Sequence, residues 1–153
     1  MSILDYFGTN HILVGIPSRS KKQVIEDLAE RAETVTGLGQ RSLLDMMMRR
    51  ERLGSTGIGD GIAIPHAVHG DLTRTIAFLA ILKTPIDFGS VDDKLVDIVC
   101  LVLGPPNNDR NHLNCISSLA RSLQHAATCD GLRAASSPEA VLQSLQQTRS
   151  VAA

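Results

Sequence analysis

The chain has 153 residues and a formal net charge of −1, with 43% hydrophobic and 20% charged residues. This length suits one domain with a substantial core, and the composition is that of an ordinary globular protein. The near-neutral charge argues against nucleic-acid binding, which needs a basic patch. No apolar run could span a bilayer and no signal peptide is recognisable, so we expect a cytoplasmic protein without membrane insertion.

Helical and strand-like segments alternate along the chain. Helices are predicted over residues 20–36 and 40–52, because apolar residues recur at helical spacing and a glycine follows each segment. Strands are predicted at residues 62–64, 74–82 and 97–103, with Thr84 and Pro85 ending the second and a short edge piece at 86–88. Further helices are predicted at residues 110–125 and 130–135, and from Pro138 onward. This alternation predicts one α/β domain over residues 1–153, a layer sandwich with a mixed β-sheet flanked by helices.

Residues 54–66 are the most informative stretch, Gly-Ser-Thr-Gly-Ile-Gly-Asp-Gly-Ile-Ala-Ile-Pro-His. Its repeated glycines permit positive φ and close backbone approach, so we interpret residues 54–61 as a loop rich in unpaired N–H groups. Residues 62–64 are interpreted as a buried strand whose continuation Pro65 blocks. His66 is therefore expected at the end of a rigid element, beside a loop of backbone amides.

The other histidines differ in their sequence context. His11 and His125 are interpreted as structural, the latter because a helix C-terminus favours a charged imidazole. His112 falls in the first turn of a predicted helix, near unsatisfied N–H groups and the positive end of the dipole. Active sites of open α/β sheets gather along one rim, so we expect His66 and His112 to lie side by side. Two imidazoles, loop amides and a helix N-terminus would suit a phosphoryl group.

The same residues could in principle serve other chemistries. His66 and His69 form an H-x-x-H pair that could bind zinc with His112 as a third ligand, but the pair lacks the glutamate of H-E-x-x-H. A catalytic triad of Ser55 with His66 lacks the G-x-S-x-G elbow. The G-x-G-x-G at residues 57–61 precedes a strand instead of opening a helix, so it does not match a dinucleotide fingerprint.

Cysteines and charge clusters are interpreted as structural. The chain has three cysteines, Cys100, Cys115 and Cys129. Because their number is odd and no two have the C-x-x-C spacing, neither a disulfide framework nor a metal site is expected. Basic pairs at residues 21–22 and 49–50 stand beside acids such as Glu51 and are interpreted as solvated helix faces.

Residues 54–66 resemble the active-site signature of the enzyme IIA domains of the bacterial phosphotransferase system, mannitol/fructose class. The likeness covers roughly residues 10–147 and includes the segments 20–22, 50–53, 84–88 and His112-Leu113. Within this class the chain is most similar to the free-standing nitrogen-regulatory IIA branch. The resemblance implies the mannitol-type enzyme IIA fold.

The resemblance also implies roles for individual residues. It makes His66 the acceptor, through Nε2, of a phosphoryl group from an HPr-type phosphocarrier protein. His112 would support that group by hydrogen bonding, and Arg50 would be the active-site arginine. A guanidinium offers charge-assisted hydrogen bonds to the added charge of about −1.5 to −2. Ser55 and Thr56 are further candidates for phosphate binding, and no metal, nucleotide or other cofactor is expected.

The chain contains no fused IIB unit, which favours a regulator whose phosphorylation state selects protein partners. The resemblance suggests kinases or potassium transport proteins as such partners. The alternatives are a stand-alone sugar-specific IIA phosphocarrier of the fructose/mannitol type, passing phosphate to a IIB unit, and a zinc-binding module. We expect a phosphotransferase component with a phosphohistidine intermediate, regulatory in role rather than metabolic.

Overall fold

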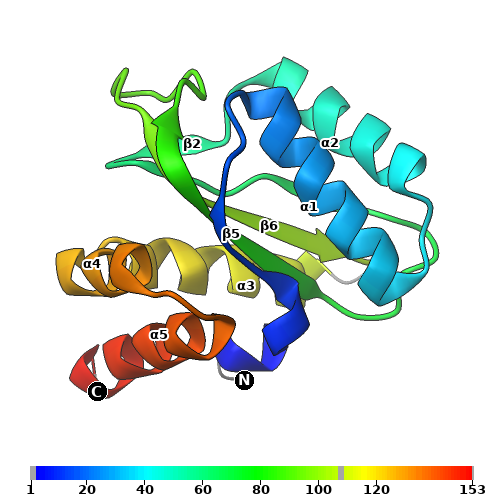
Figure 1. Ribbon diagram of the computed structural model, residues 1–153. Coiled ribbons are helices and arrows are strands. Elements are labelled where there is room, and N and C mark those ends of the chain that lie inside the picture. Colours follow the sequence, from blue (N-terminus) through cyan, green and yellow to red (C-terminus); the bar gives the residue numbers. More distant parts are fainter. Residues whose placement is uncertain (1–2, 107–108, 153) are drawn as a thin grey trace.

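The computed structural model describes residues 3–106 and 109–152, in which six strands form one mixed sheet between two layers of helices (Figure 1). The helices are α1 (Lys21–Thr36), α2 (Gln40–Leu53), α3 (Asp109–Leu123), α4 (Ala126–Ala134) and α5 (Pro138–Ala152), with 3₁₀ turns η1 (Ile3–Tyr6) and η2 (Thr9–His11). The strands are β1 (Ile12–Ile16), β2 (Gly57–Gly59), β3 (Ile62–Ala63), β4 (His66–Val68), β5 (Ile76–Ile86) and β6 (Val96–Gly104).

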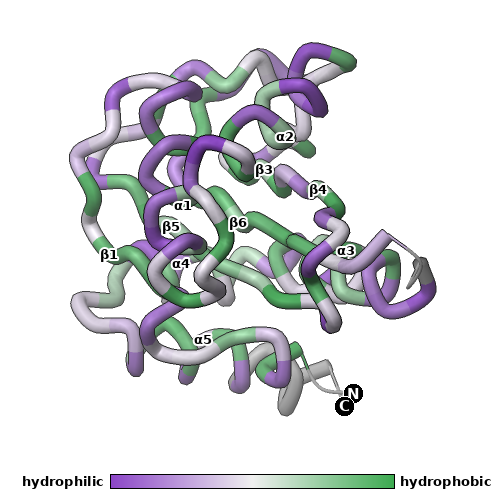
Figure 2. Tube along the Cα trace, turned by 90° about the vertical axis from the view of Figure 1, so that its right-hand side faces the viewer, coloured by the Kyte–Doolittle hydropathy of each residue, from purple (hydrophilic) through white to green (hydrophobic). Residues whose placement is uncertain are grey.

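The sheet has the strand order β1-β5-β6-β3-β2, and β4 also pairs with β6. The β1–β5, β3–β6 and β4–β6 pairs are parallel, whereas β5–β6 and β2–β3 are antiparallel. The central strand β6 is buried along almost its whole length, and its tube is largely green, that is hydrophobic, in Figure 2. Strands covered on both faces are expected to be continuous apolar runs of this kind.

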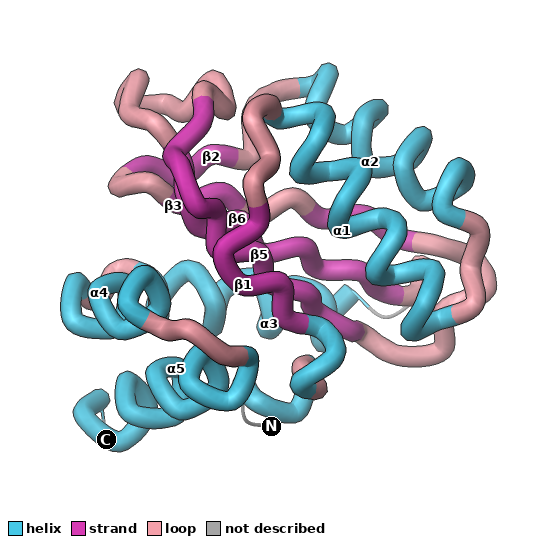
Figure 3. Tube along the Cα trace, viewed as in Figure 1, coloured by secondary structure: helices cyan, strands magenta, loops and turns pink. Residues whose placement is uncertain are grey.

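Each face of the sheet packs against its own helices (Figure 3). Successive side chains of a strand point to opposite faces. Along β5, Phe78 and Ala80 pack with α1 and α2, whereas Leu79 and Ile81 pack with α3, α4 and α5. The predicted α/β layer sandwich with a mixed sheet is therefore confirmed. Within residues 3–106 and 109–152, no helix combines the length and apolar character needed to cross a membrane.

The predicted end of a strand at Thr84 and Pro85 is wrong, because β5 continues to Ile86. Its pairing with β6 shifts between Ile81 and Ile86, so Pro85 lies at an irregularity in the ladder. Proline has no N–H to donate and is tolerated in a sheet at such interruptions.

Pro65 interrupts pairing for two residues only. β3 ends at Ala63, but β4 begins at His66, which pairs with Val102 of β6. The Val102 N–H donates to the Pro65 carbonyl at 2.9 Å, so proline keeps its acceptor role beside the sheet. His66 is therefore the first residue of a strand, whereas the sequence predicted that it follows the end of one.

The glycine-rich stretch is not the open loop that its composition suggested. Gly57–Gly59 form β2, which pairs with β3 through a turn at Asp60 and Gly61. Both turn residues have positive φ, 57° and 84°, as a two-residue type I′ hairpin requires. Asp-Gly is the strongest short-range signal for such a hairpin, so the sequence held this information.

Helix boundaries differ most around α4. This helix begins at Ala126, earlier than the predicted residue 130, and α3 ends at Leu123. His125 is consequently an exposed residue at the N-cap of α4, and its interpretation as the C-terminal residue of a helix is wrong.

Candidate functional site

His66 is held in one tautomer by its own backbone. Its half-buried ring places Nδ1 3.0 Å from the carbonyl oxygen of Ile64. A carbonyl oxygen only accepts hydrogen bonds, so Nδ1 carries the proton and Nε2 keeps its lone pair. In this tautomer, the lone pair on Nε2 of His66 could act as a nucleophile.

His112 approaches His66 from the first turns of α3. The two ring centroids lie 6.0 Å apart with an interplanar angle of 65°, so the expected proximity of these histidines is confirmed. His112 is buried, and a Cβ atom on Gly104 would lie only 2.6 Å from its Nδ1. Only glycine leaves room for this ring at the end of β6. The predicted strand ended at residue 103, and no role for Gly104 was recognised from the sequence.

Arg50 lies in the last turn of α2 and points toward the segment that follows. Its Nη1 donates to the carbonyl oxygen of Gly54 at 3.0 Å, and the residue is half-buried. A guanidinium has five N–H donors, so this bond fixes the group without exhausting its capacity for an anion.

Ser55 and Thr56 lie beside the strand that leads to His66, because the Ile64 N–H donates to the Thr56 carbonyl at 3.0 Å. Their hydroxyl groups, however, make bonds within the protein. Ser55 Oγ donates to the Phe88 carbonyl at 2.9 Å, and Thr56 Oγ1 donates to the Glu51 carboxylate. In this structure both hydroxyls therefore hold the shape of the segment, and Ser55 makes no triad bond to His66 among those described.

Glu51 organises this segment, a role that the sequence reading missed. The carboxylate is buried, accepts the Thr56 N–H at 3.1 Å and pairs with Lys21 Nζ at 2.8 Å. The Lys21 ammonium also lies 4.7 Å from the centroid of the Phe88 ring. The interpretation of these two charges as solvated helix faces is wrong. A signal existed, because Glu51 follows the buried Leu43 and Met47 at a spacing of four residues.

His69 has neighbours in its own turn and in α2. Its Nδ1 accepts the Asp71 N–H at 3.1 Å, and its Nε2 lies 3.5 Å from Ser42 Oγ. Among the described residues, no three histidine, cysteine or acidic side chains are grouped as ligands for a metal ion.

His11 and the cysteines have structural environments. His11 is buried, donates from Nδ1 to the Ala77 carbonyl at 3.0 Å and stacks on Phe78, which confirms its structural interpretation. Burial lowers the pKa of His11. The three cysteines are buried free thiols, and burial raises the pKa of Cys115 to about 12.

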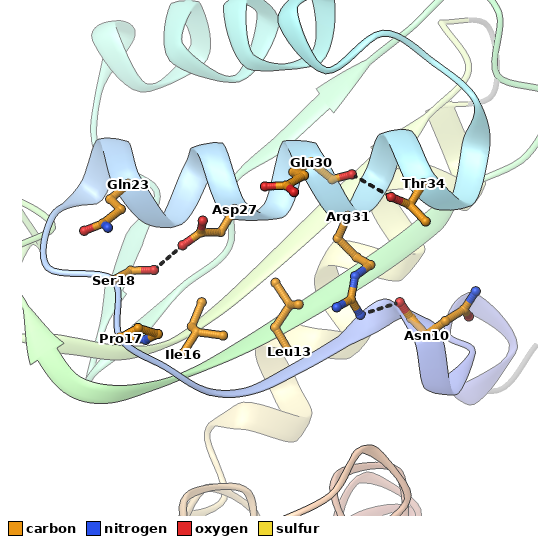
Figure 4. A pocket seen from close by; sticks show the side chains of 10 residues that line it. All are labelled: Asn10, Leu13, Ile16, Pro17, Ser18, Gln23, Asp27, Glu30, Arg31 and Thr34. Atoms are coloured by element: carbon orange, nitrogen blue, oxygen red, sulfur yellow. Dashed lines mark hydrogen bonds between the residues drawn. The ribbon is translucent and has the colours of Figure 1, made fainter.

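A pocket of about 620 Å³ lies between α1 and β1 (Figure 4). Arg31 donates to the Asn10 carbonyl at 3.0 Å across it, and Ser18 donates to Asp27. None of the described residues predicted for phosphoryl chemistry lines this pocket.

A mixed sheet flanked by helices, with two histidines meeting at its edge, describes a recognisable class of protein. Residues 5–148 match the family model described as "Phosphoenolpyruvate-dependent sugar phosphotransferase system, EIIA 2". The match spans most of the chain, and the chain therefore belongs to this enzyme IIA family.

Within the family, the chain is similar to nitrogen regulatory proteins. It is 36% identical over 141 residues to the nitrogen regulatory protein of Bradyrhizobium diazoefficiens, covering 92% of each chain. The crystal structure of nitrogen regulatory protein IIA-Ntr from Neisseria meningitidis superposes with a TM-score of 0.88 at 29% identity, covering 94% of this chain and 98% of that one. The IIA mannitol structure from Escherichia coli gives a TM-score of 0.76 at 25% identity, covering 91% and 98%. These similarities confirm the resemblance to the nitrogen-regulatory branch and to the mannitol-type fold.

Proposed function

We propose that the chain, as one IIA domain over residues 1–153, accepts a phosphoryl group on His66 from an HPr-type phosphocarrier and regulates partner proteins according to its phosphorylation state. The observation that carries this proposal is the tautomer of His66. Its Nδ1 is bonded to the Ile64 carbonyl, and its ring meets His112 edge to face. A preorganised nucleophile beside a second imidazole is what phosphoryl transfer needs.

In the proposed reaction, the lone pair of His66 Nε2 attacks the phosphorus atom of the donor. An Nε2–P bond forms while the bond between phosphorus and the donor protein breaks, and the leaving electron pair stays with the donor. Phosphoryl transfer depends mainly on positioning and on stabilising the equatorial oxygens. His112 would donate a hydrogen bond to one of these oxygens, and the Arg50 guanidinium would balance their charge.

The regulatory step is electrostatic in this proposal. Phosphorylation adds a charge of about −1.5 to −2 to a protein whose formal net charge is −1. A dianion on a half-buried side chain at the protein surface can block one interface or complete another. Regulated partners such as kinases or potassium transport proteins would then distinguish the two forms.

The first prediction concerns acceptance of the phosphoryl group. With an HPr-type donor that already carries a labelled phosphoryl group, His66→Ala abolishes incorporation because it removes the nucleophile. His112→Ala slows incorporation by roughly tenfold or more, the usual effect of losing one donor to a developing oxyanion. His69→Ala is the matched control and incorporates label like the wild type, since His69 bonds to its own turn and to Ser42. Unchanged labelling of His66→Ala would overturn the site assignment.

The alternative is a stand-alone fructose/mannitol-type IIA phosphocarrier that passes its phosphoryl group to a IIB unit. Two findings favour it: the family description names a sugar phosphotransferase system, and the fold matches a mannitol IIA structure. The chemistry at His66 would be the same in both proposals. They differ in where the phosphoryl group goes next.

A further inference from the structure

Three residues form a row across the end of the sheet that lies next to His112. In the β4–β6 pair, Val68 lies opposite Gly104. In the antiparallel β5–β6 pair, Ile76 lies opposite Leu103, so Thr75, immediately before β5, lies opposite Gly104. Residues opposite one another in neighbouring strands project to the same face of a sheet. Val68, Gly104 and Thr75 therefore form one row across the end of the sheet.

This row faces α3. Ala77 is two residues after Thr75, and Val102 is two residues before Gly104. Both therefore lie on the same face of the sheet as the row. Both belong to the hydrophobic cluster that includes Cys115 of α3. The side chain of Thr75 therefore points toward the helix that carries His112.

Thr75 and His112 share the space that glycine leaves at position 104. A Cβ atom there would lie 2.6 Å from Nδ1 of His112 and 3.3 Å from Oγ1 of Thr75. Thr75 is only 7% exposed, and its Oγ1 has no hydrogen-bond partner among the described residues. A buried hydroxyl without a partner is costly, so such a group in a folded protein calls for an explanation.

We propose that Thr75 is a positioning residue for His112. In this proposal the Thr75 hydroxyl donates to Nδ1 of His112, which selects the tautomer protonated at Nε2. Nε2 is the other ring nitrogen, and its N–H would then donate a hydrogen bond to a phosphoryl group on His66. The consequence for phosphoryl transfer rests on the proposed function, whereas the tautomer of His112 does not.

The second prediction tests this inference on the full-length, unphosphorylated chain. Nitrogen-15 NMR of the imidazoles at about pH 8, where an ordinary histidine is neutral, reports each tautomer. Thr75→Val removes the hydroxyl and keeps the shape of the side chain. It changes the tautomer ratio of His112 roughly fivefold to tenfold toward the Nδ1–H form, the effect of one hydrogen bond of ordinary strength. Thr75→Ser restores the wild-type ratio, and His66 stays Nδ1-protonated throughout as the internal control.

A His112 tautomer ratio that is the same in wild type and Thr75→Val would overturn the inference, as would a failure of Thr75→Ser to restore it. If the valine variant does not fold, Thr75→Ala removes the same hydroxyl and is measured in the same way. Phosphorylation by the HPr-type donor is the second readout, and its rate falls roughly fivefold to tenfold in Thr75→Val. A tautomer shift in a protein that never accepts phosphate would support the role of Thr75 and reject the proposed function.

Discussion

His66 and His11 make the same kind of hydrogen bond, but the two rings differ in their surroundings. Each places Nδ1 3.0 Å from a backbone carbonyl, that of Ile64 for His66 and that of Ala77 for His11. His66 is half-buried, so its second nitrogen can meet a reactant. His11 is buried and stacks on Phe78 at 4.8 Å between centroids, so its ring serves packing. At the scale of a single residue, exposure decides which imidazole is available for chemistry.

The third prediction concerns the pH dependence of stability through His11. Burial lowers its pKa in the folded protein from the ordinary 6.5, so the unfolded chain binds this proton more readily. The stability contributed by His11 is complete above the ordinary pKa. It declines as the pH falls below that value toward the lowered pKa of the folded state. In urea unfolding between about pH 7.5 and 5.5, the wild type should therefore lose more free energy of unfolding than His11→Gln.

The exposed His125 supplies the matched control for this experiment. His125→Gln should follow the wild-type pH dependence, because it leaves the buried His11 in place. Parallel stability curves for the wild type and His11→Gln would contradict the prediction.

At the scale of elements, the end of α2 and the segment after it form one unit around Glu51. The carboxylate receives the Thr56 N–H and hydroxyl and pairs with Lys21 at the start of α1. One buried anion thus joins two helices and the segment that leads into the β2–β3 hairpin. Arg50 belongs to the same unit, because its Nη1 donates to the Gly54 carbonyl at 3.0 Å.

The fourth prediction is that Glu51→Ala lowers the free energy of unfolding by roughly 2–4 kcal/mol. Removing one partner of a buried pair leaves the other charge uncompensated, and part exposure of Lys21 moderates the cost. Glu26 pairs with Lys22 at 3.9 Å on the exposed face of α1 and offers a matched control. Glu26→Ala should change stability by no more than about 0.5 kcal/mol in the same urea titration. Equal losses for the two variants would remove Glu51 from this role.

At the scale of the whole molecule, the sheet brings the candidate site residues together from distant parts of the sequence. His66 opens β4, Gly104 closes β6, and His112 lies in α3, while α2 brings Arg50 to the segment before the hairpin. Parallel pairing of β4 with β6 places His66 opposite Val102, two residues from Gly104. The surface around such a site selects partners through charge and shape, which are properties of the folded molecule.

The fifth prediction separates a regulator from a sugar-pathway carrier. The phosphorylated chain is mixed with a mannitol-type IIB protein, and label remaining on His66 is followed beside a mannitol IIA protein in parallel. A regulator retains its phosphoryl group at least about tenfold longer, since a mismatched interface costs 1.4 kcal/mol or more of binding free energy. Transfer as fast as that of the mannitol protein, with sugar phosphate formed, would favour the alternative.

Local signals in the sequence were sufficient for the fold class and for the proximity of the two histidines. Apolar periodicity predicted α1, α2 and the central strand β6, and Ser20 caps α1 as its residue type suggests. The stretch from Gly54 to His66 indicated a candidate phosphoryl site from the sequence alone, without knowledge of its spatial neighbours. The helices, the strand and the cap depend on interactions between residues a few positions apart, which a sequence records directly. The proximity of the two histidines followed from the rim that active sites of open α/β sheets share.

The tertiary structure decided what depends on residues far apart in the chain. It placed Pro85 at an irregularity in a strand, buried Glu51 against Lys21, and set Thr75 and His112 on either side of Gly104. Register with a distant strand or packing against a distant helix produces each of these environments. The sequence determined which side chains could carry the chemistry. Only the folded chain decided their burial, tautomers and partners, because these follow from the three-dimensional packing of the whole domain.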